Sequence, residues 1–347
     1  MKPSGRSASM RLYDPFIERD LEAIPGAVRE FRAEHTSDEL WQAVTRFAIL
    51  AYAPSQHAKH ALFSCLAAWD LRDVLGARFD EVVTRCAVYA AASRQPWSEP
   101  PILDPPAVAP DAPRNAEELR EAIAGGDRLR AERWLSARFQ DPDFARDYFA
   151  VAAEDPEDLG HKLIAAVAAF RLAGLLGEKG RFAALRVGIW EMVAYRGPSS
   201  NRQPTAGDPA LLASRLVERM VVERGELVAA HRLFLLDAAL LIGDGDVLAR
   251  VCGSLEADDA GESSPAGDQQ PPPAVDAIAA KRDVSPEDWI GEAPVYSLAR
   301  DYGELLKSCA VARRLAKRFP SIDAMRIIDA ARDHLTNAPS SDGFTFA

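Results

Sequence analysis

The chain has 347 residues, of which 48% are hydrophobic, and its 52 acidic residues against 41 basic ones give a formal net charge of −11. This length and apolar content suffice for two compact domains or for one larger array with a continuous core. The acidic balance argues against nucleic acid or an anionic membrane as the main partner, because both attract clustered lysine and arginine.

Cysteine spacing and hydropathy indicate the cellular compartment in which the protein resides. The four cysteines lie far apart and form no CxxC pair, so we expect neither a disulfide framework nor a zinc knuckle. The first residues carry positive charge without an apolar run after them, and the longest apolar stretches are too short and interrupted to span a bilayer. We therefore expect a cytoplasmic protein without a membrane partner.

Apolar residues recur at helical spacing along the whole chain. Residues 40–51, 82–89 and 216–221 show the pattern, and the strong helix formers alanine and leucine dominate the composition of such segments. Strand-like alternation between turn signals is essentially absent. The sequence predicts an all-α fold.

Two segments interrupt the helical pattern. Residues 95–115 are rich in proline, and residues 256–274 are small, polar and rich in proline, so both are predicted to be linkers. They leave a first helical unit at 11–94, a second and third unit at 116–255, and a C-terminal helical segment at 275–337.

A histidine-headed apolar segment occurs three times. The copies read HALFSCLAAWDL from His60, HKLIAAVAAFRL from His161 and HRLFLLDAALLI from His231. Each has leucine two residues after the histidine, phenylalanine or isoleucine three residues after it, and an Ala-Ala pair at the seventh and eighth. Repetition of this kind indicates stacked helical units with a shared core, which gives a helical repeat-like array.

The repeated histidines are candidate metal ligands. Neutral imidazole binds metals, and three equivalent helices would aim His60, His161 and His231 at one point. His57 lies on the same face one turn before His60 and is a further candidate, although we favour a helix-start or surface histidine there. Asp237 interrupts the third apolar run and needs a partner, for which we consider a hydrogen bond to a ligand histidine.

The three segments resemble the histidine-bearing helices of the questin oxidase-like family. The resemblance extends from about residue 38 to 335 and rests on short motifs. It implies a helical, oxygen-using enzyme that acts on an aromatic polyketide-type small molecule. It also implies non-heme iron bound by His60, His161 and His231, together with a histidine and a lysine, spaced HxxK, from a C-terminal helix. The family's lysine can be carboxylated.

The HxxK motif has no direct match in this chain. By spacing, the nearest string runs from Glu304 to Lys307, with glutamate in place of histidine, and a carboxylate beside histidines suits iron. An ordinary surface pair fits the same spacing, and we favour it. A second alignment, through residues 327–335, sends the motif to the tail at 340–346, which holds neither histidine nor lysine, and the site would then be incomplete.

Two functions follow from these patterns. The first is a metal-dependent oxygenase-like enzyme, with no nucleotide cofactor because neither GxGxxG nor GxxxxGK[ST] occurs in the required context. The alternative is a non-catalytic helical scaffold or ligand-binding protein whose metal site has decayed. The three histidines in register favour the first function, and the missing HxxK favours the second.

Overall fold

The fold consists of helices. The computed structural model describes residues 8–52, 58–93, 105, 115–154, 160–194, 207–222, 227–261 and 303–337, and the regular elements in these ranges are all helical. The predicted all-α fold is confirmed. None of the described helices is long and apolar enough to cross a bilayer.

The first helices form a compact N-terminal group. Thr36 and Glu39 build a capping box at the start of α3, where each side chain bonds the backbone N–H of the other residue, and this fixes the point at which the helix begins. The elements are α1 (Ala8–Glu18), α2 (Ile24–Arg32), α3 (Ser37–Ala51), α4 (Ala58–Asp70), α5 (Arg72–Leu75), the 3-10 helix η1 (Gly76–Arg78) and α6 (Phe79–Ser93).

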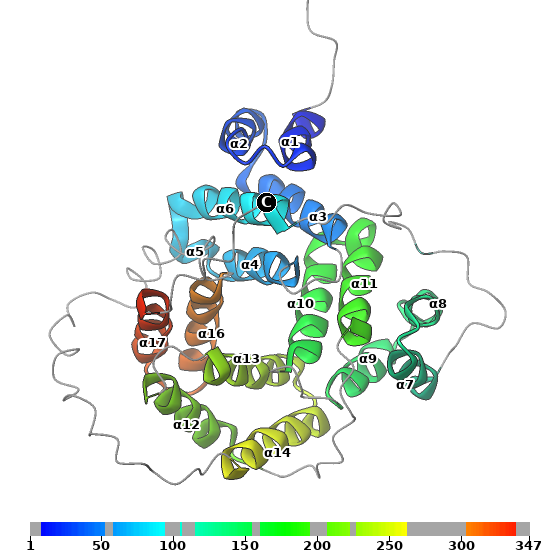
Figure 1. The fold of residues 1–347 in the computed structure, drawn as a ribbon, viewed down its shortest axis with the longest axis vertical. Helices are drawn as coiled ribbons and strands as arrows, with labels where there is room; N and C mark the ends of the chain where they lie inside the picture. Colours follow the sequence, from blue (N-terminus) through cyan, green and yellow to red (C-terminus); the bar gives the residue numbers. More distant parts are fainter. Residues whose placement is uncertain are drawn as a thin grey trace, which may run out of the picture.

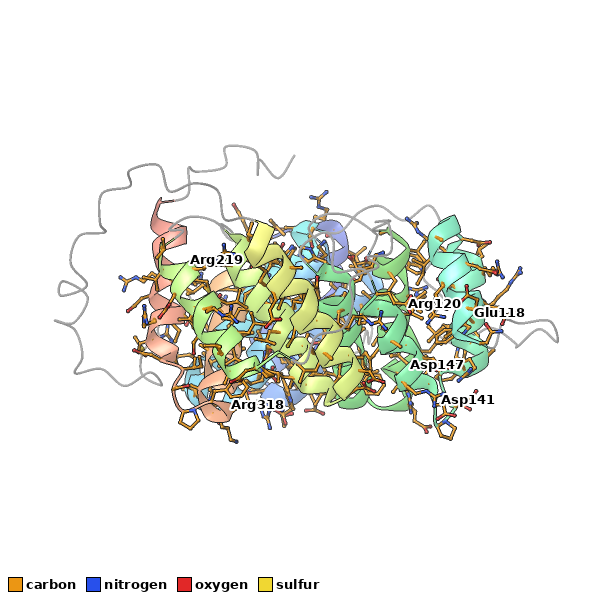
Figure 2. All side chains as sticks on the ribbon, turned by 90° about the horizontal axis from the view of Figure 1, so that it is seen from below. Glu118, Arg120, Asp141, Asp147, Arg219 and Arg318 are labelled. Carbon is orange, nitrogen blue, oxygen red and sulfur yellow. The ribbon has the colours of Figure 1, made fainter. Side chains whose placement is uncertain are left out.

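The middle of the chain adds a peripheral helical group and then two long packed helices. The elements are α7 (Ala116–Gly125), α8 (Arg128–Arg138), α9 (Phe144–Ala152), α10 (His161–Leu176) and α11 (Glu178–Ala194). Ion pairs hold the outer group together. Figure 2 shows Asp141 and Asp147 near each other at one end of the molecule, and Arg138 bridges them.

The remaining helices complete the fold. They are α12 (Pro209–Val222), α13 (Leu227–Ile242), α14 (Gly245–Gly261), α16 (Glu304–Arg318) and α17 (Ala324–Asn337). Because α14 continues to Gly261, the predicted linker start at residue 256 is wrong. The run from Glu256 to Ala260 contains no glycine or proline that would end a helix. Residues 262–274 and most of 95–115 lie outside the described residues.

Four helices form an inner ring. Going round it, α4 contacts α10, α10 contacts α13, α13 contacts α16, and α16 contacts α4 again (Figure 1). A second layer covers the ring, with α3 and α6 packed on α4, α11 on α10, α12 and α14 on α13, and α17 on α16. The C-terminal helix α16 is therefore one of the four walls of the ring.

One hydrophobic cluster runs through the three predicted units and the C-terminal segment. It contains buried residues of the first unit, such as Trp41, of the second and third, such as Leu163 and Leu233, and of the C-terminal segment, such as Leu306. The three histidine-headed segments are the inner helices α4, α10 and α13. The repeat in the sequence therefore marks the innermost layer of the fold.

Candidate functional site

The inner helices carry the candidate residues at or near their N-terminal ends. His161 and Glu304 are the first residues of α10 and α16, while His60 and His231 lie in the first and second turns of α4 and α13. All four side chains are buried. A glycine in the left-handed conformation precedes both α10 and α16, with φ of 76° at Gly160 and 73° at Gly303. The two helices therefore both begin directly after a left-handed glycine, a conformation that glycine adopts without steric cost.

The structure brings the four side chains together. The ring centroids of His60 and His161 are 5.9 Å apart, and those of His161 and His231 are 4.9 Å apart. Glu304 Oε1 lies 3.3 Å from His60 Nδ1 and 3.8 Å from His231 Nε2. Three imidazoles and one carboxylate thus gather at one end of the inner ring.

Lys307 lies one helical turn after Glu304 and enters the same cluster. Its Nζ is 2.8 Å from His60 Nδ1 and forms a close ion pair with Glu304 Oε1. The same Nζ lies over the rings of Phe63 and Phe234, at 5.6 and 5.8 Å from their centroids. Glu304 is only 3% exposed and Lys307 only 7%, so the interpretation of this pair as a surface pair is wrong.

Burial and charge act together on the ionisable groups of this site. Burial would raise the pKa of Glu304, but Lys307 and the neighbouring histidines outweigh it and hold that pKa well below its usual value. Burial and the positive charge of Lys307 lower the pKa of His60 well below its usual value. Near neutral pH the site accordingly contains a glutamate carboxylate and a neutral His60 imidazole.

The helix α16 is a fourth copy of the repeat, which the sequence analysis missed because Glu304 replaces the histidine. With Glu304 aligned to His60, five positions are identical. They are Leu306 with Leu62, Ser308 with Ser64, Cys309 with Cys65, Ala312 with Ala68 and Leu315 with Leu71. A search based on these residues, without the histidine, would have found the copy.

A pocket runs along the axis of the ring, and the repeat explains its lining. Each helix contributes the third, sixth, seventh and tenth residues after its histidine or glutamate. These are Phe63, Leu66, Ala67 and Asp70; Ile164, Val167, Ala168 and Arg171; Phe234, Asp237, Ala238 and Leu241; and Lys307, Ala310, Val311 and Arg314. Because the head residues meet at one end of the pocket and Asp70, Arg171 and Arg314 meet at the other, the helices that carry them run in the same direction along the pocket. The pocket has a volume of about 70 Å³.

The end of the pocket away from the histidines is ringed by charged residues. Arg171 donates two hydrogen bonds to Asp70, of 2.8 and 2.6 Å. Arg314 bonds Asp70 at 2.5 Å and Asp237 at 2.6 Å. The prediction that Asp237 accepts a hydrogen bond from a ligand histidine is therefore wrong. Asp237 lies six residues after His231, which places it roughly 9 Å further along the helix axis, beside Arg314.

The donor atoms suit a metal, but the side chains are not set out around one. Within the described residues, no group of three or more histidine, cysteine, aspartate or glutamate side chains is arranged to hold a metal ion. Lys307 explains this, because its ammonium group contacts donor atoms of both His60 and Glu304. Glu304 Oε2 is buried and has no hydrogen-bond partner among the described residues, so it remains available to a cation.

Two of the sequence-predicted candidates are not covered by the structure. His57 and the tail alignment at residues 340–346 lie outside the described residues. His35 stacks on Phe31 in the N-terminal group, with ring centroids 4.0 Å apart. Of the sequence-predicted site residues, His60, His161, His231, Glu304 and Lys307 meet in one cluster.

Comparison with known proteins adds no relative. No family model, no curated protein and no solved structure matches the chain.

Proposed function

We propose that the chain is a metal-dependent, oxygenase-like enzyme with His60, His161, His231 and Glu304 as the ligands of one metal ion. The observation that supports this most directly is the equivalence of the four positions. Each is the head residue of one copy of the repeat, and the packing of the copies around the inner ring brings three imidazoles and a carboxylate together in a buried cluster. The resemblance to the questin oxidase-like family supports the oxygenase chemistry.

The donor set favours iron over harder or softer ions. Imidazoles combined with a carboxylate suit Fe²⁺ among the first-row metals, whereas a hard ion such as Mg²⁺ prefers oxygen ligands alone. Such a metal, when bound, would supply redox chemistry with dioxygen. The chain's own residues would bind the metal, exclude water through the surrounding apolar walls and orient the substrate in the pocket.

Lys307 must release its contacts with His60 and Glu304 before these two side chains can bind a metal. Its ammonium group balances the charge of Glu304 and contacts His60, so a divalent cation would compete with it for the same donor atoms. The lysine side chain is long and flexible and can withdraw toward the pocket, which it already lines.

The pocket limits the substrate. Its volume of about 70 Å³ is well below the roughly 150 Å³ of an engineered cavity that binds benzene. A polycyclic aromatic molecule, which the resemblance implies, does not fit unless the inner helices separate. We therefore propose a slimmer substrate than the aromatic polyketides of that family.

Metal analysis tests the site. Protein purified without a histidine tag and incubated with Fe²⁺ under anaerobic conditions should retain one metal ion per chain after gel filtration. His161→Ala should lose it, because a ligand is removed while the apolar stripe behind it stays. His35→Ala, which removes a histidine outside the cluster, serves as the control and should bind metal like the wild type. Wild-type protein without metal, or equal loss in both variants, would contradict the proposal.

A non-catalytic scaffold is the second candidate, and the Lys307 ion pair favours it. An ammonium group that already satisfies Glu304 and His60 gives the site a stable, metal-free form. Lys307→Gln distinguishes the two functions. Removal of the competing cation should tighten metal binding in the enzyme. In the scaffold it should give only a less stable protein, still without metal.

A further inference from the structure

We propose that the inner-ring pocket is a site for dioxygen, which enters beside Leu241 and reaches the cluster of histidines and glutamate along the ring axis. This inference names one substrate of the proposed function and the place where it is held. It rests on that function for what happens to the gas at the metal, whereas the binding of a gas needs no metal. The volume of the pocket, its walls, its two ends and a second cavity support it.

The volume of the pocket restricts its occupant to a few atoms. About 70 Å³ is more than the roughly 10–15 Å³ that one water molecule needs and less than half of the roughly 150 Å³ of an engineered cavity that binds benzene. A diatomic gas or a single xenon atom is smaller than benzene and fits. An organic molecule with a ring or a long chain does not fit.

The walls make the middle of the pocket apolar. Apart from Asp237 and the charged residues at the two ends, they consist of phenylalanine, leucine, isoleucine, valine and alanine side chains. The carboxylate of Asp237 already accepts hydrogen bonds from Arg314. A water molecule in a cavity needs roughly two to four polar partners, whereas dioxygen is apolar and needs none. The middle of the pocket therefore favours an apolar gas over water.

The charged end of the pocket, away from the histidines, offers no unbalanced charge to an ion. The guanidinium groups of Arg171 and Arg314 are paired with the carboxylates of Asp70 and Asp237. A charged ligand would lose hydration there without gaining a free counter-charge, which costs free energy. A neutral gas has no such cost.

Leu241 provides an apolar entrance at this charged end. Three of the four inner helices place a charged residue at this level, and α13 places Leu241 there, with an exposed fraction of 41%. The side chains of Arg171 and Arg314 are also partly exposed, whereas those of His60 and Glu304 at the other end are buried. The pocket therefore opens to solvent beside Leu241.

Lys307 lies between the inner end of the pocket and the candidate metal ligands. It lines the pocket, and its Nζ contacts His60 Nδ1 at 2.8 Å and forms the ion pair with Glu304. The turns of Lys307 and Arg314 are seven residues apart, which corresponds to about 10 Å along the helix axis. When Lys307 releases its contacts, as metal binding requires, a gas molecule in the pocket has a short path to the donor atoms.

A second cavity lies behind two residues of the pocket wall. Phe63 and Ala168 line both cavities, and the other lining residues of the second one are apolar except Lys59. Its volume of about 10 Å³ is close to the roughly 10–15 Å³ that one water molecule needs. A gas can occupy two such small, neighbouring spaces, whereas one larger ligand cannot.

Nuclear magnetic resonance of metal-free, full-length protein with labelled methyl groups tests the binding. Xenon, an inert apolar atom, and dioxygen, which is paramagnetic, are dissolved under pressure as probes. Xenon should shift the methyl signals of Ile164, Val167 and Ala238 in a saturable way, and dioxygen should raise the relaxation rates of the same groups. Val28 is the internal control, because it is buried in α2 away from the pocket, and its methyl signals should change much less.

Variants locate the site and its entrance. Ala238→Leu fills the middle of the pocket and should abolish both effects. Leu241→Trp enlarges an exposed side chain at the entrance, so the core stays intact, and it should slow the exchange of xenon. Leu211→Trp is the matched control, because Leu211 on α12 is 54% exposed and does not line the pocket. Circular dichroism checks that each variant is folded.

The reaction of the Fe²⁺-loaded protein with dioxygen tests the use of the gas. Leu241→Trp should lower the second-order rate constant for oxidation of the iron, because dioxygen enters more slowly. It should leave the amount of bound iron unchanged, because Leu241 lies at the opposite end of the pocket from the ligands. Leu211→Trp should react like the wild type.

Two results would overturn the inference. One is that neither gas affects the pocket methyl groups of the folded wild type more than those of Val28. The other is that xenon exchanges with folded Leu241→Trp as fast as with the wild type. If both gases occupy the pocket but the protein holds no metal, the gas site stands and the proposed enzyme function falls. If metal binds and neither gas occupies the pocket, the reverse holds.

Discussion

At the scale of single residues, Glu304 and Lys307 each make the burial of the other tolerable. A lone buried charge is costly, and the two groups are 3% and 7% exposed at the histidine end of the inner ring. Lys307→Met should therefore lower the free energy of unfolding of the metal-free protein by about 3–5 kcal/mol, because Glu304 loses its main counter-charge. Urea denaturation followed by circular dichroism measures the loss.

The double variant Glu304→Met/Lys307→Met is the matched control. Two apolar side chains of similar length leave no charge unpaired, and such replacements of buried ion pairs are often neutral or stabilising. The double variant should recover most of the stability that the single one loses. If the single variant were as stable as the wild type, Lys307 would not offset the free-energy cost of burying Glu304.

The sequence predicted the residues of the site better than their surroundings. The repeated frame identified His60, His161 and His231, because a helix that repeats its core pattern also repeats the direction of its head residue. Burial of Glu304 and Lys307 was missed, since the neighbours that surround α16 come from α4 and α13, far away in the sequence. The partner of Asp237 was missed for the same reason, because Arg314 lies 77 residues further along the chain.

At the scale of helices, the glycine before α10 sets where His161 points. Gly160 has φ of 76°, and a Cβ added there would come within 2.7 Å of the Leu235 side chain on α13. Gly160→Ala should destabilise the protein by at least about 1–2 kcal/mol, from the left-handed backbone conformation alone. It should also weaken metal binding, because the start of α10 must shift.

Gly174→Ala in the same helix gives the control for that prediction. No atom lies within 4 Å of the place where its Cβ would be, and its φ is not positive. Alanine is the better helix former, so this variant should be more stable than the wild type by about 0.5–1 kcal/mol. Thermal unfolding of the two variants side by side measures both effects, and destabilisation of equal size in both would contradict the role of Gly160.

The sequence predicted which segments are helical better than it predicted where a helix ends or which helices close the ring. Periodicity gave the all-α fold and the three inner helices that begin with histidine. It misjudged the end of α14, because the polar run up to Gly261 looks like a linker although nothing in it stops a helix. It also missed the closure of the ring, because the fourth wall carries glutamate where the other three carry histidine.

At the scale of the whole molecule, the ring makes the predicted helical units and the C-terminal segment depend on one another. The inner helices α4, α10 and α13 come from the first, second and third units, and α16 comes from the C-terminal segment. Leu306 and Cys309 of α16 are fully buried, and α16 packs against both α4 and α13. Removal of α16 would expose the apolar faces of two inner helices and open the pocket to water.

A chain that ends at residue 261 tests this dependence. We expect it to bind the dye ANS and to unfold over a broad urea range, because a ring that has lost one wall keeps its helices without fixed side-chain packing. The full-length Glu304→Met/Lys307→Met variant distinguishes the loss of helix α16 from the loss of the ion pair. It keeps α16 but has no ion pair, and it should unfold sharply. A peptide of residues 303–337, added to the truncated chain, should restore part of the cooperativity by refilling the gap between α4 and α13. A truncated chain that unfolds as sharply as the full-length protein would show that the first three units form a complete core without α16.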